Sequence, residues 1–170
     1  MGIIFSVTLI VMVSLPGEQI DDLSSIKIIA NLPITGPASG IGIENRDGLH
    51  LAVNTLNSHG GINGKNIELI ILDNETNLEK AKEIFIQTET THKPLVHISS
   101  LSFISTGLGP LAEENKSLLI ALSAVAPEVT HEKDWVFRYF AMAEEESIPT
   151  IQTLDKLNIN NLGILYLDDE

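Results

Sequence analysis

Short apolar runs alternate with segments of helical periodicity along most of this chain. Runs rich in Ile, Leu and Val predict six strands, at Ile26–Asn31, Ile67–Asp73, Leu95–Ile98, Leu118–Ala121, Trp135–Tyr139 and 161–170. Apolar residues spaced three and four apart predict four helices, at about 43–58, 78–90, 103–115 and 147–159. Strict alternation of the two predicts an α/β fold: a Rossmann-like open parallel sheet with helices on both faces.

The apolar stripes of the first three helices are expected to form the core, because each stripe must be buried against the sheet. Their members are Leu49, Ala52, Val53 and Leu56, then Leu78, Ala81, Ile84 and Phe85, then Ile104, Leu108, Leu111 and Ala112. The segment GGING, Gly60 to Gly64, is expected to end the first helix in a tight turn, since glycine tolerates positive φ.

The last predicted strand stops at Glu170, where a strand-to-helix loop should begin. A parallel edge strand with nothing after it leaves backbone groups and an apolar face uncovered. The pattern therefore suggests the front part of a longer protein.

The N-terminus carries eleven residues without a charge, Ile3 to Val13, followed by the helix breakers of SLPGEQ. Such a run is short for a membrane span and typical of a secretory signal peptide, expected here at residues 1–17, with a linker at 18–25. No Lys or Arg precedes Lys27, so the usual positive start is missing. The alternatives are a buried strand, a wrongly assigned start, or a segment retained as an anchor.

The amino-acid composition limits the kinds of partner and chemistry to be expected of this protein. The chain has 23 acidic and 10 basic residues, a formal net charge of −13, so it is not expected to bind nucleic acid or an anionic membrane surface. It has no cysteine, which excludes disulfides, thiolate zinc sites and thiol catalysis.

The stretch TGPASGIG, Thr35 to Gly42, has the glycine spacing of a dehydrogenase cofactor loop and follows a predicted strand. Pro33 and Pro37 remove backbone donors from that loop, and no acid follows at the distance needed to hold a ribose. The Tyr-x-x-x-Lys pair is also absent, because Ala143 and Glu170 stand four residues after the two tyrosines. The sequence therefore favours neither a nicotinamide cofactor nor an enzyme.

A metal site is not expected. His92 and His97 lie five residues apart across a strand start and would not share a face, so single solvated or partly buried histidines are predicted. The acidic runs AEEES and LDDE are interpreted as solvated charge at a helix start and in a loop.

Serines stand out at the expected carboxyl ends of strands. The segment SSLS, Ser99 to Ser102, follows the third strand, and Ser123 follows the fourth. Ligands of open parallel sheets bind at this edge, where hydroxyls and helix N-termini suit a polar anion. Ser100 or Ser102 could equally cap the third helix, and the two roles are compatible.

Several segments together resemble the type I periplasmic solute-binding proteins, most closely the leucine/isoleucine/valine-binding receptors of ABC transporters. They are the opening segment from IKIIANLPITGPASGIG to the strand ending in Asp73, then PLAEENKSLLIALSAVAPEVT, and DWVFRYF. The resemblance runs from Ile26 to the end of the chain.

This resemblance implies two Rossmann-like lobes that close on a solute about a hinge. It places an incomplete N-terminal lobe at 26–137, a hinge crossover at 138–143 and the start of a second lobe at 144–170. A full member is about twice as long, so the chain alone is expected to bind solute weakly or not at all.

The resemblance also implies the ligand contacts. The serine that receives an amino-acid carboxylate corresponds to Ser102, with Ser100 as the alternative. The segment that meets the ammonium group corresponds to Ser123, Ala124 and Val125, and an aromatic residue of the first loop corresponds to Ile41. The family's threonine is Val125 here, so an amide or a small carboxylic acid stays open beside an amino acid.

The implied function is capture of a small polar solute outside the cytoplasm and its delivery to an ABC permease in the membrane, without a cofactor. The localisation expected is periplasmic or extracellular. The alternative is the ligand-binding domain of a membrane signalling receptor.

Overall fold

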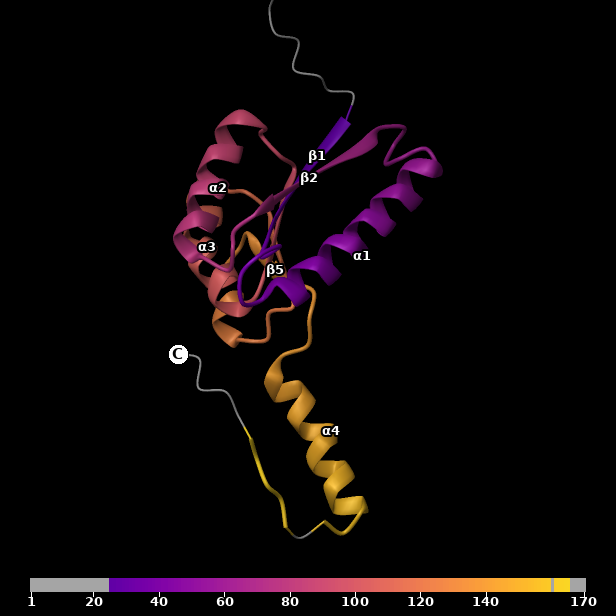
Figure 1. The fold of residues 1–170 in the computed structure, drawn as a ribbon, viewed down its shortest axis with the longest axis vertical. Coiled ribbons are helices and arrows are strands. Elements are labelled where there is room, and N and C mark those ends of the chain that lie inside the picture. Colours follow the sequence, from indigo (N-terminus) through magenta and orange to yellow (C-terminus); the bar gives the residue numbers. More distant parts are fainter. Residues whose placement is uncertain (1–24, 160, 166–170) are drawn as a thin grey trace, which may run out of the picture.

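The computed structural model describes residues 25–159 and 161–165 (Figure 1). The expected signal peptide, the linker except Ser25, and the LDDE run lie outside the described residues. Strands and helices alternate as the sequence predicts. In order they are β1 (Ser25–Leu32), α1 (Ser39–Ser58), β2 (Asn66–Asp73), α2 (Leu78–Thr91), β3 (Val96–Ser100), α3 (Ser102–Asn115), β4 (Leu119–Leu122), the short 3-10 helix η1 (Pro127–Val129), β5 (Val136–Arg138) and α4 (Ala143–Lys156).

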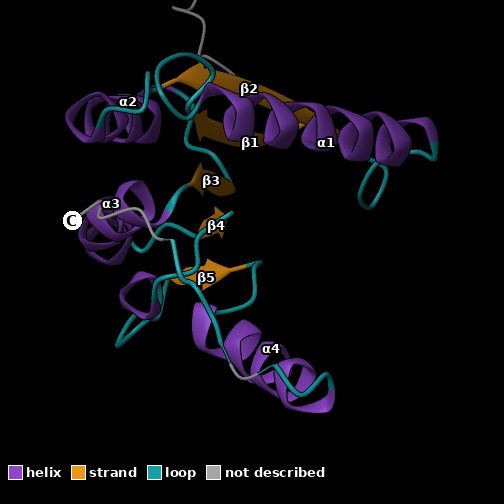
Figure 2. Ribbon diagram, turned by 60° about the horizontal axis from the view of Figure 1, so that its bottom comes forward, coloured by secondary structure: helices purple, strands orange, loops and turns teal. Residues whose placement is uncertain are grey.

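The strands form one parallel sheet in the order β2-β1-β3-β4-β5. Helix α1 covers one face, and α2 and α3 cover the other (Figure 2). The predicted fold class is thus confirmed. Because all strands run the same way, their carboxyl ends meet at one edge, and the loops after β1, β3 and β4 share that edge.

The main core lies between the sheet and the pair α2 and α3. It is built from small and branched residues that interdigitate around the ring of Phe85. Its fully buried members are Ala81, Phe85, Ile104, Leu108, Ala112, Leu119, Ala121, Ala124, Val129 and Val136. The predicted stripes of α2 and α3 therefore do face the core, with Leu78 and Leu111 packed at its margin.

The opposite face carries a smaller cluster of Ala30, Leu32 and Ile98, against which Leu49 of α1 packs. Here the predicted core stripe is only partly correct, because Ala52 and Leu56 are exposed. Within the described chain α1 is the single helix on this face. Its flanks therefore meet solvent.

The start of α1 and the end of β3, both at the carboxyl edge of the sheet, differ from the prediction. Helix α1 begins at Ser39, not Ile43, because the turn closes at once through hydrogen bonds from Ser39 N to Gly36 O and from Gly42 N to Ala38 O. Strand β3 extends through Ser99 and Ser100, which pair with β4, so these serines end the strand and do not follow it.

His97 departs from its expected exposure. It is 1% exposed within β3, its ring stacks on Phe85 at a centroid distance of 4.1 Å, and its Nε2 lies 2.9 Å from Glu89 Oε1. Burial lowers the pKa of His97, and Glu89 opposes that change. The prediction of a solvated or partly buried histidine was wrong here, because the β3–α2 packing supplies both an apolar cover and an acid partner.

The C-terminal part differs most. Helix α4 begins at Ala143, four residues before the prediction, with Met142 N donating to Glu145 Oε2, and no residue of α4 is buried. Glu144, Glu145 and Glu146 occupy its first turn, as predicted. The sixth strand does not form at residues 161–165, and its remainder lies outside the described residues. No described strand lies beside it to accept its hydrogen bonds.

None of the described helices combines the length and the apolar character that crossing a membrane requires.

Candidate ligand-binding site

Ser102 is the first residue of α3, directly after β3. Its hydroxyl does not cap its own helix; Oγ accepts hydrogen bonds from Val125 N at 3.0 Å and Ala126 N at 3.2 Å, in the loop after β4. A hydroxyl that accepts two hydrogen bonds keeps its own hydrogen to donate. No described residue accepts that hydrogen, so Ser102 presents a donor where two loops meet.

The backbone is strained on both sides of this contact. Leu101 has φ of 71° and Ser123 has φ of 49°, and neither is glycine. Such conformations cost about 1–3 kcal/mol each and persist where the surrounding contacts impose them. Here Leu101 N donates to Leu122 O at 3.2 Å, which ties one loop to the other. The two strained residues therefore stand at the ends of adjacent strands, on either side of the Ser102 contact.

The loop after β4 is also held from its far side. Arg138, the last residue of β5, donates from Nη1 to Ala126 O at 2.8 Å and from Nη2 to Thr130 Oγ1 at 3.4 Å. Ala126 is therefore fixed through both its amide and its carbonyl. The loop is preorganised before any ligand arrives.

A second polar cluster joins three elements beside Ser102. Asn45 of α1 donates from Nδ2 to Ser100 Oγ at 2.8 Å, and Ser123 Oγ donates to Asn45 Oδ1 at 3.4 Å. Ser100 is fully buried, so its hydroxyl serves this bridge. Sequence reasoning missed Asn45. Its one available signal was its position four residues after Ile41, which places both on one side of α1.

The other expected contacts are spread around this edge. Ile41 is 40% exposed and lies on the first turns of α1, not in the loop before it. Ala124 is fully buried in the main core, while Val125 and Ser123 are half-buried. Ser102, Ser123 and Val125 therefore come together, Ser100 lies beneath them, and no described contact joins Ile41 to them.

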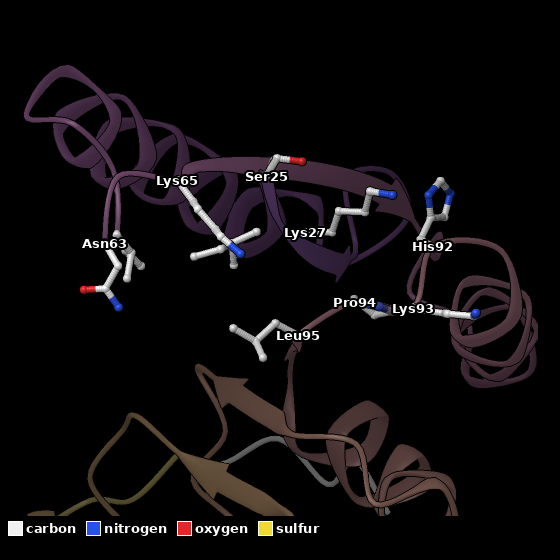
Figure 3. Close-up of a pocket in the computed structure, with 10 residues that line it drawn as sticks. Ser25, Lys27, Asn63, Lys65, His92, Lys93, Pro94 and Leu95 are labelled. Carbon is white, nitrogen blue, oxygen red and sulfur yellow. The ribbon is translucent and has the colours of Figure 1, made fainter. Parts of the chain in front are cut away.

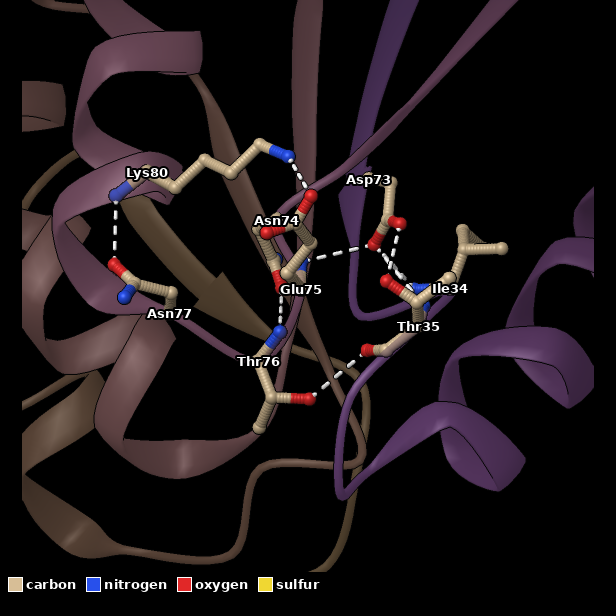
Figure 4. A network of polar contacts seen from close by, with 8 residues as sticks. All are labelled: Ile34, Thr35, Asp73, Asn74, Glu75, Thr76, Asn77 and Lys80. Carbon is tan, nitrogen blue, oxygen red and sulfur yellow. Dashed lines mark hydrogen bonds and ion pairs between the residues drawn. The ribbon is translucent and has the colours of Figure 1, made fainter.

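The loop of TGPASGIG is held by the carboxylate of Asp73 at the end of β2 (Figure 4). Asp73 Oδ1 accepts from Ile34 N at 2.9 Å, Thr35 N at 3.1 Å and Glu75 N at 2.9 Å, and Oδ2 accepts from Thr35 Oγ1 at 2.7 Å. Burial, the largest single influence, raises the pKa of Asp73, but the four hydrogen bonds together lower it below its usual value.

At two positions in this loop the neighbouring backbone lies too close to leave room for a side chain, so glycine is required. A Cβ at Gly36, whose φ is 85°, would lie 2.5 Å from Glu75 O, and a Cβ at Gly42 would lie 2.0 Å from Pro33 O. The glycines thus let the loop pack against its neighbours, and its amides at Ile34 and Thr35 bond to a carboxylate of the chain itself. This accounts for the dehydrogenase-like spacing without a phosphate.

Within the described residues, no group of three His, Asp or Glu side chains is placed to hold a metal ion.

Comparisons with known proteins agree with this arrangement. Residues 25–170 match the family model described as periplasmic binding protein. A leucine-, isoleucine-, valine-, threonine- and alanine-binding protein of Pseudomonas aeruginosa is 31% identical over 108 residues, covering 62% of this chain and 28% of that protein.

Solved structures show the same fold. The branched-chain amino acid transporter substrate-binding protein LivJ of Streptococcus pneumoniae, in complex with isoleucine, is 27% identical with a TM-score of 0.67, covering 69% of this chain and 34% of that one. An ABC transporter substrate-binding protein of Desulfitobacterium hafniense, in complex with Leu, is 24% identical with a TM-score of 0.71, covering 85% and 42%.

The chain therefore spans between about a quarter and two fifths of the length of these relatives. The family match covers nearly all described residues, and the sheet, its helices and its loops agree with it. The chain belongs to the periplasmic binding proteins of type I.

Proposed function

We propose that this protein binds a small polar solute at the carboxyl edge of its sheet, on the loops that follow β3 and β4. The observation that carries the proposal is the Ser102 hydroxyl, which fixes Val125 N and Ala126 N and keeps a hydrogen to donate. A donor of this kind suits a carboxylate or amide oxygen of the solute. No bond is made or broken in this role.

An amino acid is the first solute to consider. The relative from Pseudomonas aeruginosa is named for five amino acids, and LivJ was solved with isoleucine. Val125 offers no hydroxyl to an ammonium group, and Ala124 is buried. A solute with a carboxylate or amide but without a free ammonium group therefore fits this chain equally well.

The wider role follows from the family. We propose that the protein works outside the cytoplasm, where it delivers its solute to an ABC permease. The segment 138–143 is proposed as a hinge crossover, because it leads from β5 to α4, whose residues are all outside the core. Solute held on one lobe would gain contacts from a second lobe and so favour the closed state.

The first experiment is an NMR titration of the 170-residue chain with leucine, isoleucine, their amides and small carboxylic acids. We expect saturable amide shifts at Ser102, Ser123 and Val125 with at least one of these solutes. Shifts confined to other parts of the chain would contradict the proposal.

Single substitutions then test whether the Ser102 hydroxyl itself contributes to solute binding. Ser102→Ala removes the donor and should weaken binding by about 1–3 kcal/mol if the hydroxyl meets a charged carboxylate. Ser102→Thr keeps a hydroxyl and should retain most of the affinity. Ser58→Ala, at the far end of α1, is the matched control because its exposed hydroxyl bonds only within the helix end and to His59. Equal binding by all three variants would remove Ser102 from the site.

A further inference from the structure

A hollow lies at the end of the sheet opposite the proposed solute-binding edge, where β1, β2 and β3 begin (Figure 3). We call it the amino-end pocket; it has a volume of about 470 Å³ and is lined from the start of β1, the turn before β2 and the segment before β3. Eight residues of β1 separate it from the solute-binding edge, roughly 20 Å or more along the strand. This volume falls in the range of small-molecule sites.

The charge of the amino-end pocket is opposite to that of the whole chain. Lys27, Lys65 and Lys93, three of the ten basic residues, line it together with His92, and none of the aspartates or glutamates that the structure describes does. The lining residue Ser25 donates from Oγ to Glu68 Oε2 at 3.1 Å. Among the described residues neither Lys27 nor Lys65 forms an ion pair. In a chain with a net charge of −13, a local group of cations attracts an anion.

The remaining lining is apolar. Ile26, Ile62 and Leu95 face the same space, and Ile62 and Leu95 are 41% and 64% exposed. In Figure 3 the Lys65 side chain reaches toward the middle of the pocket, Leu95 approaches from the β3 side, and Lys27 extends toward His92. Ammonium groups beside exposed aliphatic side chains suit a ligand with one anionic end and a short apolar body.

The walls of the pocket are held by main-chain hydrogen bonds. Leu95 N donates to Lys27 O at 2.9 Å, which fixes the segment before β3 against β1. Ile62 and Lys65 exchange two hydrogen bonds of 2.9 and 3.0 Å across the GGING turn. A Cβ at Gly61 would lie 2.0 Å from Lys65 O, so the turn is closely packed at this point. The lining residues are therefore set in place without a ligand.

We propose that the amino-end pocket binds a small aliphatic carboxylate, with Lys27 and Lys65 at its charged end and Ile26, Ile62 and Leu95 against its chain. This site is independent of the proposed solute-binding edge. The lining residues named here lie in the described part of the chain, so the proposal can be tested on the 170-residue protein.

The test is an NMR titration of the 170-residue protein with hexanoate, sulfate and hexanamide. Hexanoate has both a negative charge and an aliphatic chain. Sulfate has a negative charge but no chain, and hexanamide has the chain but no charge. We expect hexanoate to bind most tightly and to shift the amides of Lys27, Lys65 and Leu95. Hexanoate shifts confined to Ser102 and Ser123 would assign it to the other edge and overturn this proposal, as would sulfate binding of equal strength.

Charge-removing variants complete the test. Lys27→Gln and Lys65→Gln should each weaken hexanoate binding about fivefold, the effect of an exposed charge pair worth about 1 kcal/mol. Lys156→Gln, an exposed lysine in the last turn of α4, is the matched control and should bind unchanged. Lys65 lies exposed in a turn, so its variant remains decisive if Lys27→Gln disturbs β1. Unchanged hexanoate affinity in Lys65→Gln, followed at the amides of Lys27 and Leu95, contradicts the proposal.

Discussion

Single polar side chains hold the binding edge of this sheet in shape. Ser102 fixes the loop after β4, Asn45 bridges the ends of β3 and β4, and Asp73 holds the loop after β1. Each accepts or donates across elements that lie 23 to 78 residues apart in sequence. These polar side chains form hydrogen bonds between elements that are distant in sequence. A solute could bond only to the donors and acceptors that these hydrogen bonds leave unused.

The contribution of the Asp73 carboxylate to stability can be tested by varying the pH. Because its pKa is lowered in the folded protein, the unfolded chain takes up a proton first as pH falls below about 4. The stabilisation is therefore complete above the ordinary aspartate pKa and is lost as pH falls through the folded one. Asp73→Asn should lower the free energy of unfolding by about 1–3 kcal/mol at pH 7, and by less at pH 3.5, measured by urea unfolding.

The control for this effect is Asp47→Asn. Asp47 is largely exposed and pairs only with its neighbour Arg46, so its loss should change stability little at either pH. An Asp73→Asn variant with the same deficit at both pH values would show that the carboxylate charge is not responsible.

The helices are positioned on the sheet in two ways: by close contact between backbones at a glycine, and by burial of apolar side chains. Helix α1 buries only Gly42 completely, and that glycine lies against Pro33 at the end of β1. The entry of α1 is therefore determined by one missing side chain. By contrast, α2 and α3 are held by buried Phe85, Ile104 and Leu108.

Two glycines of the same helix should respond in opposite directions. Gly42→Ala places a Cβ 2.0 Å from a carbonyl oxygen, so α1 must shift, at a cost of about 1–3 kcal/mol. Gly48→Ala meets nothing within 4 Å and should stabilise the helix by about 0.5–1 kcal/mol. Thermal unfolding of both variants measures the difference; a gain in stability from Gly42→Ala would refute the close approach.

The molecule as a whole is one open sheet with an exposed C-terminal segment. Phe137 of β5 is 54% exposed, Tyr139 and Phe140 after it are 80% and 48% exposed, and no residue of α4 is buried. The described chain would therefore present one side of the proposed solute site. Its relatives are about twice as long.

This arrangement predicts weak solute binding by the 170-residue chain. One lobe offers few of the contacts that enclose a solute, while the cost of immobilising the solute is the same. We expect dissociation constants of about 1 mM or weaker for leucine and isoleucine, measured by NMR titration or calorimetry. Micromolar binding would show that the edge of one lobe is sufficient.

The alternation of strands and helices was predictable from the sequence, because burial on both faces of a parallel sheet leaves strong apolar runs such as that of β2. The serines at the carboxyl edge of the sheet could be placed for the same reason, since they come at the ends of those runs. Their roles were not predictable. Whether Ser102 caps its helix or bonds to Val125 depends on where a loop 23 residues away is placed.

Residue order thus determined the fold class, the order of elements and the family of this protein, since these depend on local periodicity and short motifs. Tertiary structure decided that Ser99 and Ser100 extend β3, that His97 is buried beside Glu89, and that Asn45 and Asp73 organise the binding edge. It also decided that residues 161–165 form no strand. Each of these depends on a partner distant in sequence, which no local pattern contains.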